Sequence, residues 1–206
     1  MLAPPTAWAA FTEQGATVLG GVNFSGRSVS LADIDNDGDL DVFFQGPNAA
    51  DRQLLRNNFI GTGSFTFTNV TSTMIPAGLT SSWSAAWADY DGDGLVDVFV
   101  GQQNPGANVG DLLRNNGTFF SNETLSTNLT DPGFHQNVGW VDINNDGLLD
   151  LIIGMEGPEK HEIYLQGPGN QFTPVGAQVG FQVPFGTNGY GMAIGDVDGD
   201  GDLDIY

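Results

Sequence analysis

Short runs of apolar residues alternate with polar, glycine-rich segments along the whole chain, without the periodicity of an amphipathic helix. In residues 81–130 the runs are, in order, SSWSAAWADYD, LVDVFVGQ, VGDLLRNNG and TFFSNETLST. Their short length and their Val, Phe and Trp content favour β-strands, and the Asn-Gly pair after the third run is a typical hairpin turn. The pattern predicts four short antiparallel strands in this segment.

The same order of runs occurs three times and begins a fourth time. DRQLLRNN and HEIYLQG take the place of the third strand in the other two complete units, and FTFTNVTST and QFTPVGAQV take the place of the fourth. Repeats of about 50 residues with four strands each are typical of β-propeller blades. We therefore predict an all-β fold, a β-propeller of four-stranded antiparallel blades with four repeats visible. A stack of separate sandwiches or a β-solenoid is the alternative architecture.

We expect one repeat domain over residues 1–206, divided into units of unequal completeness. The expected units are an orphan outer strand at 1–21, blades at 22–78, 79–131 and 132–185, and half a blade at 186–206. Residues 10–21 resemble the fourth strands, and the last unit has no outer strands of its own. Pairing of these two parts would remove two open edges. It would give a four-bladed ring within one chain or a head-to-tail assembly between chains, unless the chain is part of a larger propeller.

An acidic nonapeptide, D-x-[DN]-x-D-G-x-x-D, joins the first and second strands of every unit. Its first aspartates are Asp33, Asp89, Asp142 and Asp196, in steps of 56, 53 and 54 residues. The formal net charge of the chain is −20, and 15 of its 25 acidic residues stand at positions 1, 3, 5 and 9 of these loops. Carboxylates this close repel one another strongly. A solvated, disordered stretch would tolerate that repulsion, but a strand follows each loop directly, so we expect a bound cation.

Oxygen ligands at alternate positions favour Ca²⁺, which accepts six to eight oxygens at roughly 2.3–2.6 Å. Glycine at position 6 permits a sharp turn, and the residue at position 7 is expected to contribute only its backbone carbonyl. An EF-hand is disfavoured, because its loop ends in a glutamate at position 12 and is flanked by helices. The expected metal-ligating residues are Asp33, Asp35, Asp37, Asp39, Asp41, Asp89, Asp91, Asp93, Leu95, Asp97, Asp142, Asn144, Asp146, Leu148, Asp150, Asp196, Asp198, Asp200, Asp202 and Asp204.

The acidic loop before a DVFVG-type strand, with LLRNNG and FTFTNVT after it, resembles the FG-GAP/VCBS repeats of integrin-α-type calcium-binding propellers. The resemblance covers nearly the whole chain. It implies about four Ca²⁺ ions, each in the hairpin between the first and second strands of a blade, and ligands at positions 1, 3, 5 and 9 of each loop. It also implies an extracellular adhesion or lectin module. Asn144, a neutral ligand, is expected to weaken the third site.

The composition of the chain limits the kinds of partner and the cellular location that we expect for the protein. The strong negative charge disfavours nucleic acid and anionic membranes as partners, and no apolar run is long enough for a transmembrane helix. The N-terminal MLAPPTAWAA lacks the basic region of a secretion signal, and the absence of cysteine excludes disulfides and thiolate metal sites. Sequons for N-glycosylation support an extracellular or cell-surface location. They are Asn23, Asn69, Asn116, Asn122 and Asn128.

We expect a structural or adhesive module that engages copies of itself, another extracellular protein or glycans. A lectin is the alternative, because Trp83, Trp87, Trp140 and Tyr190 lie on or near first strands, although packing between blades is the favoured role for these residues. We expect no catalytic activity, since no hydrolase, zinc-protease or phosphate-loop motif occurs. His135 and His161 have no evident catalytic partner and are expected on the surface.

Overall fold

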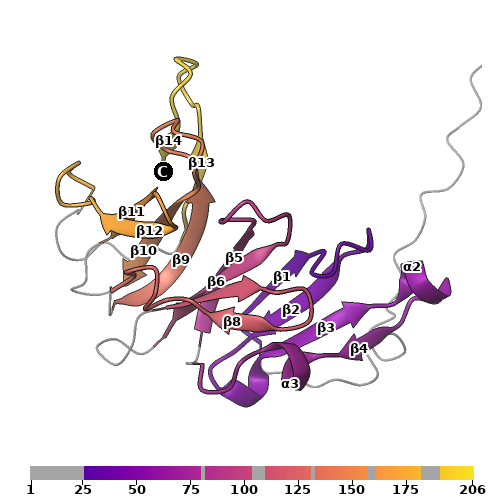
Figure 1. Cartoon of the computed structure of the whole chain (residues 1–206). Coiled ribbons are helices and arrows are strands. Elements are labelled where there is room, and N and C mark those ends of the chain that lie inside the picture. The colour runs from indigo at the N-terminus through magenta and orange to yellow at the C-terminus, as the bar shows by residue number, and fades with distance from the viewer. Residues whose placement is uncertain (1–25, 80–81, 104–109, 131–132, 157–160, 182–190) are drawn as a thin grey trace, which may run out of the picture.

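The computed structural model describes residues 26–79, 82–103, 110–130, 133–156, 161–181 and 191–206, and within them the protein is a row of antiparallel sheets (Figure 1). Blade 1 contains β1 (Ser28–Ala32), β2 (Asp41–Gln45), β3 (Gln53–Asn57) and β4 (Phe67–Asn69). Blade 2 contains β5 (Ser82–Ala88), β6 (Asp97–Gln102), β7 (Asp111–Asn115) and β8 (Phe120–Asn122). Blade 3 contains β9 (Phe134–Val141), β10 (Asp150–Glu156), β11 (Glu162–Gly167) and β12 (Gln171–Pro174). Half-blade 4 is the hairpin of β13 (Ile194–Gly195) and β14 (Asp204–Ile205).

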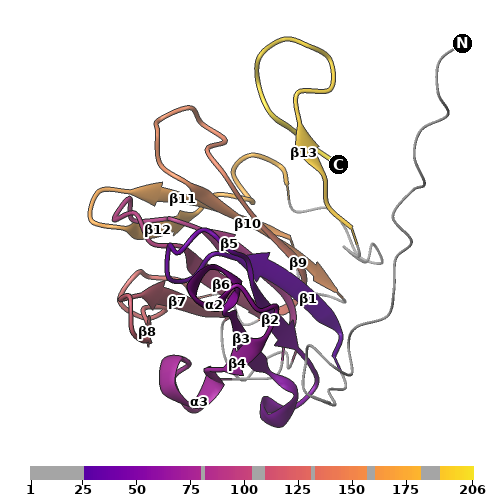
Figure 2. The same cartoon turned by 90° about the vertical axis from the view of Figure 1, so that its right-hand side faces the viewer.

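Strand order within each sheet follows the chain, so every blade is a meander from its inner strand outward. The inner strands β1, β5 and β9 lie next to one another, and the sheets follow in sequence from blade 1 to half-blade 4 (Figures 1 and 2). This arrangement confirms the predicted all-β, blade-based fold. The predicted outer strand at 1–21, and with it the closure of the ring, lies outside the described residues.

The apolar core lies between the blades. In β6, Val98 and Val100 pack toward blade 1, whereas Phe99 between them packs toward blade 3. Alternate residues of a strand point to opposite faces of its sheet, so a blade covered on both sides needs apolar residues at consecutive positions. This is why the second strands appear in the sequence as continuous apolar runs.

Two tryptophans on inner strands complete these interfaces. Trp87 packs edge-on against Phe43 of blade 1, with ring centroids 5.6 Å apart, and its Nε1 donates to Ser30 Oγ at 2.8 Å. Trp140 stacks on Tyr90 of blade 2 at 5.9 Å, and its Nε1 donates to a backbone carbonyl of β5 at 3.1 Å. The favoured role in packing between blades is thus confirmed for Trp87 and Trp140. Tyr190 lies outside the described residues.

The fourth strands are shorter than expected. FTFTNVTST forms strand only over β4 and continues as the one-turn helix α3 (Thr71–Met74); α2 (Phe59–Thr62) and the 3₁₀ turn η1 (Ala49–Asp51) are the other helical pieces of the described chain. Thr71 Oγ1 accepts a hydrogen bond from Leu54 N on β3 at 2.8 Å. In blade 2, Thr124 Oγ1 likewise accepts from Leu112 N at 2.8 Å. A threonine hydroxyl therefore takes over the ladder bond that the fourth strand would have made.

His135 corrects another expectation. It is fully buried at the start of β9, where its ring stacks on Phe99 at 5.9 Å and its Nδ1 lies 3.4 Å from Gln102 N. His161 is partly buried, and its Nδ1 accepts from Met155 N at 2.9 Å. His135 is buried because β9 begins earlier than the acidic motif suggests and extends beneath blade 2.

Candidate metal-binding loops

Each acidic nonapeptide is the hairpin between the first and second strands of a blade. The strand register brings the residue before the loop opposite its ninth residue, as in Ala32 opposite Asp41 and Ala88 opposite Asp97. Strands flank the loop on both sides, so the arrangement is not that of an EF-hand. The loop ends are therefore fixed by sheet hydrogen bonds before any ligand is considered.

The aspartate at position 1 shapes the loop through its two oxygens. In loop 1, Asp33 Oδ1 accepts from Asp37 N at 3.1 Å, and Oδ2 accepts from Gly38 N at 2.9 Å. Asp89 and Asp142 make the same two bonds in loops 2 and 3, to the backbone N–H groups of positions 5 and 6. In loop 4, Asp196 accepts from Gly199 N and Gly201 N. The repeated sequence thus folds into a repeated loop geometry.

Two positions in every loop have left-handed backbone conformations. Position 6 is always glycine, with φ between 88° and 96°, as the sequence predicted. Position 4 is also left-handed, with φ between 57° and 79°, and it is Asn36, Gly92, Asn145 or Gly199. Glycine and asparagine adopt this conformation with little strain. The restriction to Asn and Gly at position 4 was visible in the four copies and is a structural requirement that the sequence analysis missed.

The aspartate at position 9 joins the loop to the third strand. Asp97 is fully buried; its Oδ2 accepts from Tyr90 N at 3.2 Å and its Oδ1 from Asn115 N of β7 at 2.7 Å. Asp41 and Asp150 make the equivalent pairs of bonds in blades 1 and 3. Burial raises the pKa of Asp97 to about 7 and that of Asp41 to about 6, although the backbone hydrogen bonds partly oppose the shift. These carboxylates hold the fold together, a role that the sequence analysis did not assign to them.

Carboxylate oxygens converge in three of the four loops. Within the described residues, one oxygen from each of three aspartates lies within 4.8 Å of the others in each of these groups: Asp33, Asp35 and Asp37; Asp89, Asp91 and Asp97; and Asp196, Asp198 and Asp204. In loop 3 the third position is Asn144, so that loop offers fewer carboxylates. Asn144 Oδ1 accepts from Asp146 N at 3.0 Å, which leaves the amide oxygen turned into the loop.

Loop 1 contains buried oxygens without a hydrogen-bond donor. Asp35 Oδ1 and Asp39 Oδ1 are both inaccessible to solvent and lack a partner among the described residues. Burial raises the pKa of Asp35, and the negative charge of neighbouring Asp37 raises it further. A buried carboxylate oxygen without a donor is costly, and a cation bound to it would remove that cost.

The side chain of Asp39, at position 7 of loop 1, has a structural role that the sequence analysis did not assign to it. Its side chain is buried, and its Oδ2 accepts from Ile60 N at 2.9 Å at the start of α2. The aspartate therefore connects loop 1 to the β3–β4 connection. Leu95 and Leu148 occupy position 7 in loops 2 and 3 and cannot make this bond.

Arginines from the third strands reach two of the loops. In blade 2 the Arg114 guanidinium binds both Asp91 and Asp93. In blade 1 the equivalent Arg56 lies 3.9 Å from Asp35. The same register position in blade 3 is Leu165. The LLRNN sequence, present twice, was the signal for these ion pairs, and the sequence analysis used it only as a family resemblance.

Side-chain amides connect the loops of adjacent blades. Asn115 Nδ2 of blade 2 donates to Ile34 O of loop 1 at 2.8 Å. Gln166 Nε2 of blade 3 donates to Tyr90 O of loop 2 at 3.0 Å. Loop 1 also contacts loop 2 directly, through Asn36 Nδ2 and Gly94 O at 2.7 Å. Loops 1 and 2 are therefore each held by the blade that follows, and they support each other.

The sequons differ in accessibility. Asn69, Asn122 and Asn128 are exposed, whereas Asn116 is partly buried and its Nδ2 donates to Ser121 Oγ at 3.1 Å. Asn23 lies outside the described residues. The Nδ2 atoms of Asn69, Asn122 and Asn128 also donate hydrogen bonds, to Gln53, Asp111 and Phe172, so it is exposure alone that separates these three sequons from Asn116.

Comparison with known protein families agrees with the geometry of these loops. The FG-GAP-like repeat matches the chain three times, at residues 49–100, 89–153 and 142–206. The first match spans the outer strands of blade 1 and the acidic loop of blade 2, and each of the other two matches spans two successive acidic loops. A search of curated proteins found no significant match. The three repeat matches together cover more than half of the chain, which therefore belongs to the FG-GAP-like repeat family.

Proposed function

We propose that the chain is a calcium-binding β-propeller module of an extracellular protein, with a structural or adhesive role and no catalytic activity. The observation that carries the proposal is the repeated loop in which the position-1 carboxylate orders the backbone while further carboxylate oxygens converge nearby. The family assignment supports the propeller-type module, since FG-GAP repeats often bind Ca²⁺ and are typical of extracellular proteins.

The donor set fits a hard cation. In the three groups of converging aspartates every candidate ligand atom is an oxygen, and His135 and His161 both lie on strands or their ends away from the acidic hairpins. Zinc and copper favour nitrogen or sulfur ligands, and Mg²⁺ is seldom enclosed by protein ligands alone. Asp35 Oδ1, which is buried and has no donor among the described residues, is an oxygen whose environment such an ion would improve.

Bound Ca²⁺ would stabilise the fold rather than perform chemistry. Four ions would offset eight of the twenty net negative charges. A ligand that binds only the native state stabilises it by about 2.7 kcal/mol per site at a hundredfold excess over Kd. For affinities in the range of extracellular modules, roughly 10⁻⁴–10⁻³ M, millimolar Ca²⁺ would be needed.

Equilibrium dialysis of chelator-treated protein against millimolar Ca²⁺ tests the proposal. We expect about four ions per chain, a higher melting temperature, and little effect of equimolar Mg²⁺. Asp35→Ala should remove one ion. Asp202→Ala is the matched control, because Asp202 stands at position 7 with an exposed side chain, and it should retain all four. Absence of Ca²⁺ binding to the folded wild-type protein would refute the proposal.

The extracellular setting rests on separate observations. Among the described residues, no helix has the length and apolarity to cross a membrane. Asn69, Asn122 and Asn128 are exposed sequons. Expression through a eukaryotic secretory pathway, followed by glycosidase treatment and mass spectrometry, should show occupancy at these asparagines before any at Asn116. An unmodified secreted chain would contradict the proposed glycoprotein character.

A further inference from the structure

One position of the third strand changes together with position 3 of the acidic loop. It directly precedes the residue whose backbone N–H binds the position-9 aspartate, and it is Arg56 in blade 1, Arg114 in blade 2 and Leu165 in blade 3. The two arginines pair with Asp35 and Asp91, the aspartates at position 3. In the blade that carries Leu165, position 3 is the neutral Asn144. The positive charge and the negative charge are therefore present together or absent together.

In loop 2 the guanidinium of Arg114 joins positions 3 and 5. Its Nε binds Asp91 Oδ2, its Nη2 binds Asp93 Oδ2, and its Nη1 donates to Asn116 Oδ1 at 3.3 Å. The converging oxygens of this loop belong to positions 1, 3 and 9, and the group does not include Asp93. The guanidinium thus holds the position-5 carboxylate outside the group of converging oxygens.

Loop 1 shows the arrangement with a looser arginine. Arg56 lies 3.9 Å from Asp35, and within the described part of the chain it forms no ion pair with Asp37 at position 5. The converging oxygens here belong to positions 1, 3 and 5, which are Asp33, Asp35 and Asp37. Position 5 therefore joins the other carboxylates in the loop whose arginine does not bind it.

Loop 3 makes the contact between positions 3 and 5 without a charge. Asn144 Oδ1 accepts from Asp146 N at 3.0 Å, and Asn144 Nδ2 donates to Asp146 Oδ2 at 3.0 Å. The same oxygen of the position-5 carboxylate is bound by the guanidinium in loop 2. A side-chain amide thus takes over in loop 3 what a cation does in loop 2.

We propose that Arg114 is a tethered cation that occupies loop 2 in the absence of Ca²⁺ and that Ca²⁺ displaces its guanidinium from Asp91 and Asp93. The inference rests on the proposed binding of Ca²⁺ and adds that the loops are regulated differently. The Arg114 side chain is 35% exposed. It can therefore leave the loop by rotation about its own bonds while β7 keeps its place in the sheet.

The displacement makes the affinities of loops 2 and 3 more similar than their carboxylates suggest. Four aspartates and one arginine leave loop 2 with a formal charge of −3, and three aspartates leave loop 3 with the same charge. A unit positive charge about 4 Å from a divalent ion lowers its binding constant by about tenfold or more. Loop 3 has no such cation to displace, which offsets the weakening expected from Asn144.

NMR of the arginine Nε–H groups tests the proposal on the unaltered protein. The chain contains only five lysines and arginines together, so the signals are few, and Arg114→Leu identifies the signal of Arg114. The backbone N–H groups of Gly38, Gly94 and Gly147 report on loops 1, 2 and 3 separately, because each donates to the position-1 carboxylate of its own loop.

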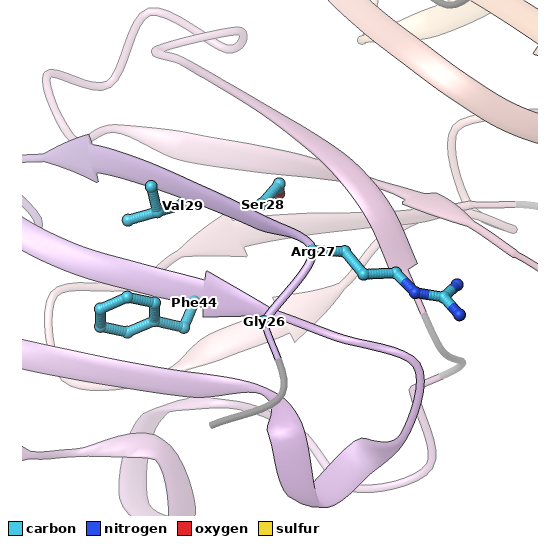
Figure 3. Close-up of a pocket in the computed structure, with 5 residues that line it drawn as sticks. All are labelled: Gly26, Arg27, Ser28, Val29 and Phe44. Carbon is cyan, nitrogen blue, oxygen red and sulfur yellow. The ribbon is translucent and has the colours of Figure 1, made fainter. Parts of the chain in front are cut away.

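Arg27 is the matched control arginine, because it stands at the end of β1 opposite to loop 1. Its guanidinium lies 4.0 Å from the centroid of the Trp83 ring. In Figure 3 its side chain extends away from Val29 and Phe44. The hollow shown there contains no residue of an acidic loop and is lined by Gly26, Arg27, Ser28, Val29 and Phe44. The Arg27 signal should not respond to Ca²⁺.

In chelator we expect the Nε–H of Arg114 to exchange slowly with water, because it is hydrogen-bonded to Asp91. Added Ca²⁺ should move its signal to that of a solvated arginine, with the same midpoint as the Gly94 signal. A Gly94 signal that responds while the Arg114 signal does not would overturn the inference and leave the proposed function intact. If none of the three glycine signals responds, the proposed function and the inference are both wrong.

Loop 3 allows the reverse experiment. Asn144→Asp alone adds a carboxylate and should raise the Ca²⁺ affinity of loop 3 by about tenfold. Adding Leu165→Arg restores the pair found in blade 2 and should remove this gain. Leu165 is partly buried, as Arg114 is, and the melting temperature in chelator verifies folding. An unchanged affinity after the second substitution would overturn the inference. If the double variant does not fold, the Arg114 signal of the wild type decides.

Discussion

Replacement of Asp97 by alanine should destabilise the protein even when no metal ion is present. The substitution removes the acceptors of two buried hydrogen bonds, from Tyr90 N at 3.2 Å and from Asn115 N at 2.7 Å. A buried donor left without a partner costs about 1–3 kcal/mol, so the two together cost about 2–6 kcal/mol. The raised pKa of Asp97 indicates that burying its charge is itself unfavourable. The substitution removes this unfavourable contribution as well, so we expect the net loss of stability to lie near the lower end of the range of about 2–6 kcal/mol.

Urea unfolding followed by tryptophan fluorescence, in chelator and in millimolar Ca²⁺, measures this loss. Asp93→Ala in the same loop is the control. Asp93 is exposed, and among the described residues its carboxylate accepts only from Leu95 N and the Arg114 side chain. In chelator we expect a loss of about 2 kcal/mol or more for Asp97→Ala and less than about 1 kcal/mol for Asp93→Ala. If Asp97→Ala matches the wild type in chelator and weakens the protein only in Ca²⁺, the carboxylate is a metal ligand alone and our assignment of a structural role is refuted.

Three further predictions concern pH, the arginine and the blade interface. In chelator, the free energy of unfolding should fall as pH rises from about 4 to about 7, because folded Asp97 and Asp41 keep protons that the unfolded chain has released. Ca²⁺ should abolish this fall. A free energy of unfolding that rises over this pH range in chelator would contradict the prediction. Arg114→Leu should increase the Ca²⁺ affinity of loop 2, because it removes a competing cation, and Arg56→Leu should have a smaller effect on loop 1. If Ca²⁺ titrations give the same affinities for both variants and the wild type, the guanidinium does not compete with the ion. Trp140→Phe should cost about 1–2 kcal/mol, since it loses the hydrogen bond to β5 and part of the stack on Tyr90; an unchanged urea midpoint would exclude that contribution.

The repeated features of the fold could be predicted because they depend on local sequence. The alternation of apolar runs and turns predicted where the second and third strands of the blades lie. The glycine at position 6 predicted a sharp turn, and all four loops make this turn. Four aligned copies also made the acidic loops recognisable as hairpins. In each case a residue and its structural consequence lie within a few positions of each other.

Features that depend on distant partners could not be read in the same way. Asp97 and Asp93 look alike in the sequence, but only Asp97 faces the N–H of Asn115, which is 18 residues further along the chain. His135 is buried because blade 2 covers the start of β9. The short fourth strands depend on Thr71 and Thr124, whose hydroxyls replace ladder bonds of the third strands. Each of these outcomes depends on residues that are distant in the sequence, which lie within the same blade for the aspartate and the threonines and in the neighbouring blade for His135.

The amides that cross from one blade to the next give the array a direction. Asn115 of blade 2 supports loop 1 and Gln166 of blade 3 supports loop 2, so each of these two third-strand donors lies on the blade that follows the loop it holds, whereas Asn36 of loop 1 donates in the other direction, to Gly94 O. Folding of one blade would therefore order the acidic hairpin of the blade before it. Because that hairpin is then already ordered, it loses less conformational entropy when it binds an ion. Hydrogen exchange in loop 1 should therefore become faster when Asn115 is replaced by alanine, and hydrogen exchange in loop 2 should become faster when Gln166 is replaced by alanine. The ion occupancy of loops 1 and 2 would then report on whether the blade that follows each of them is folded.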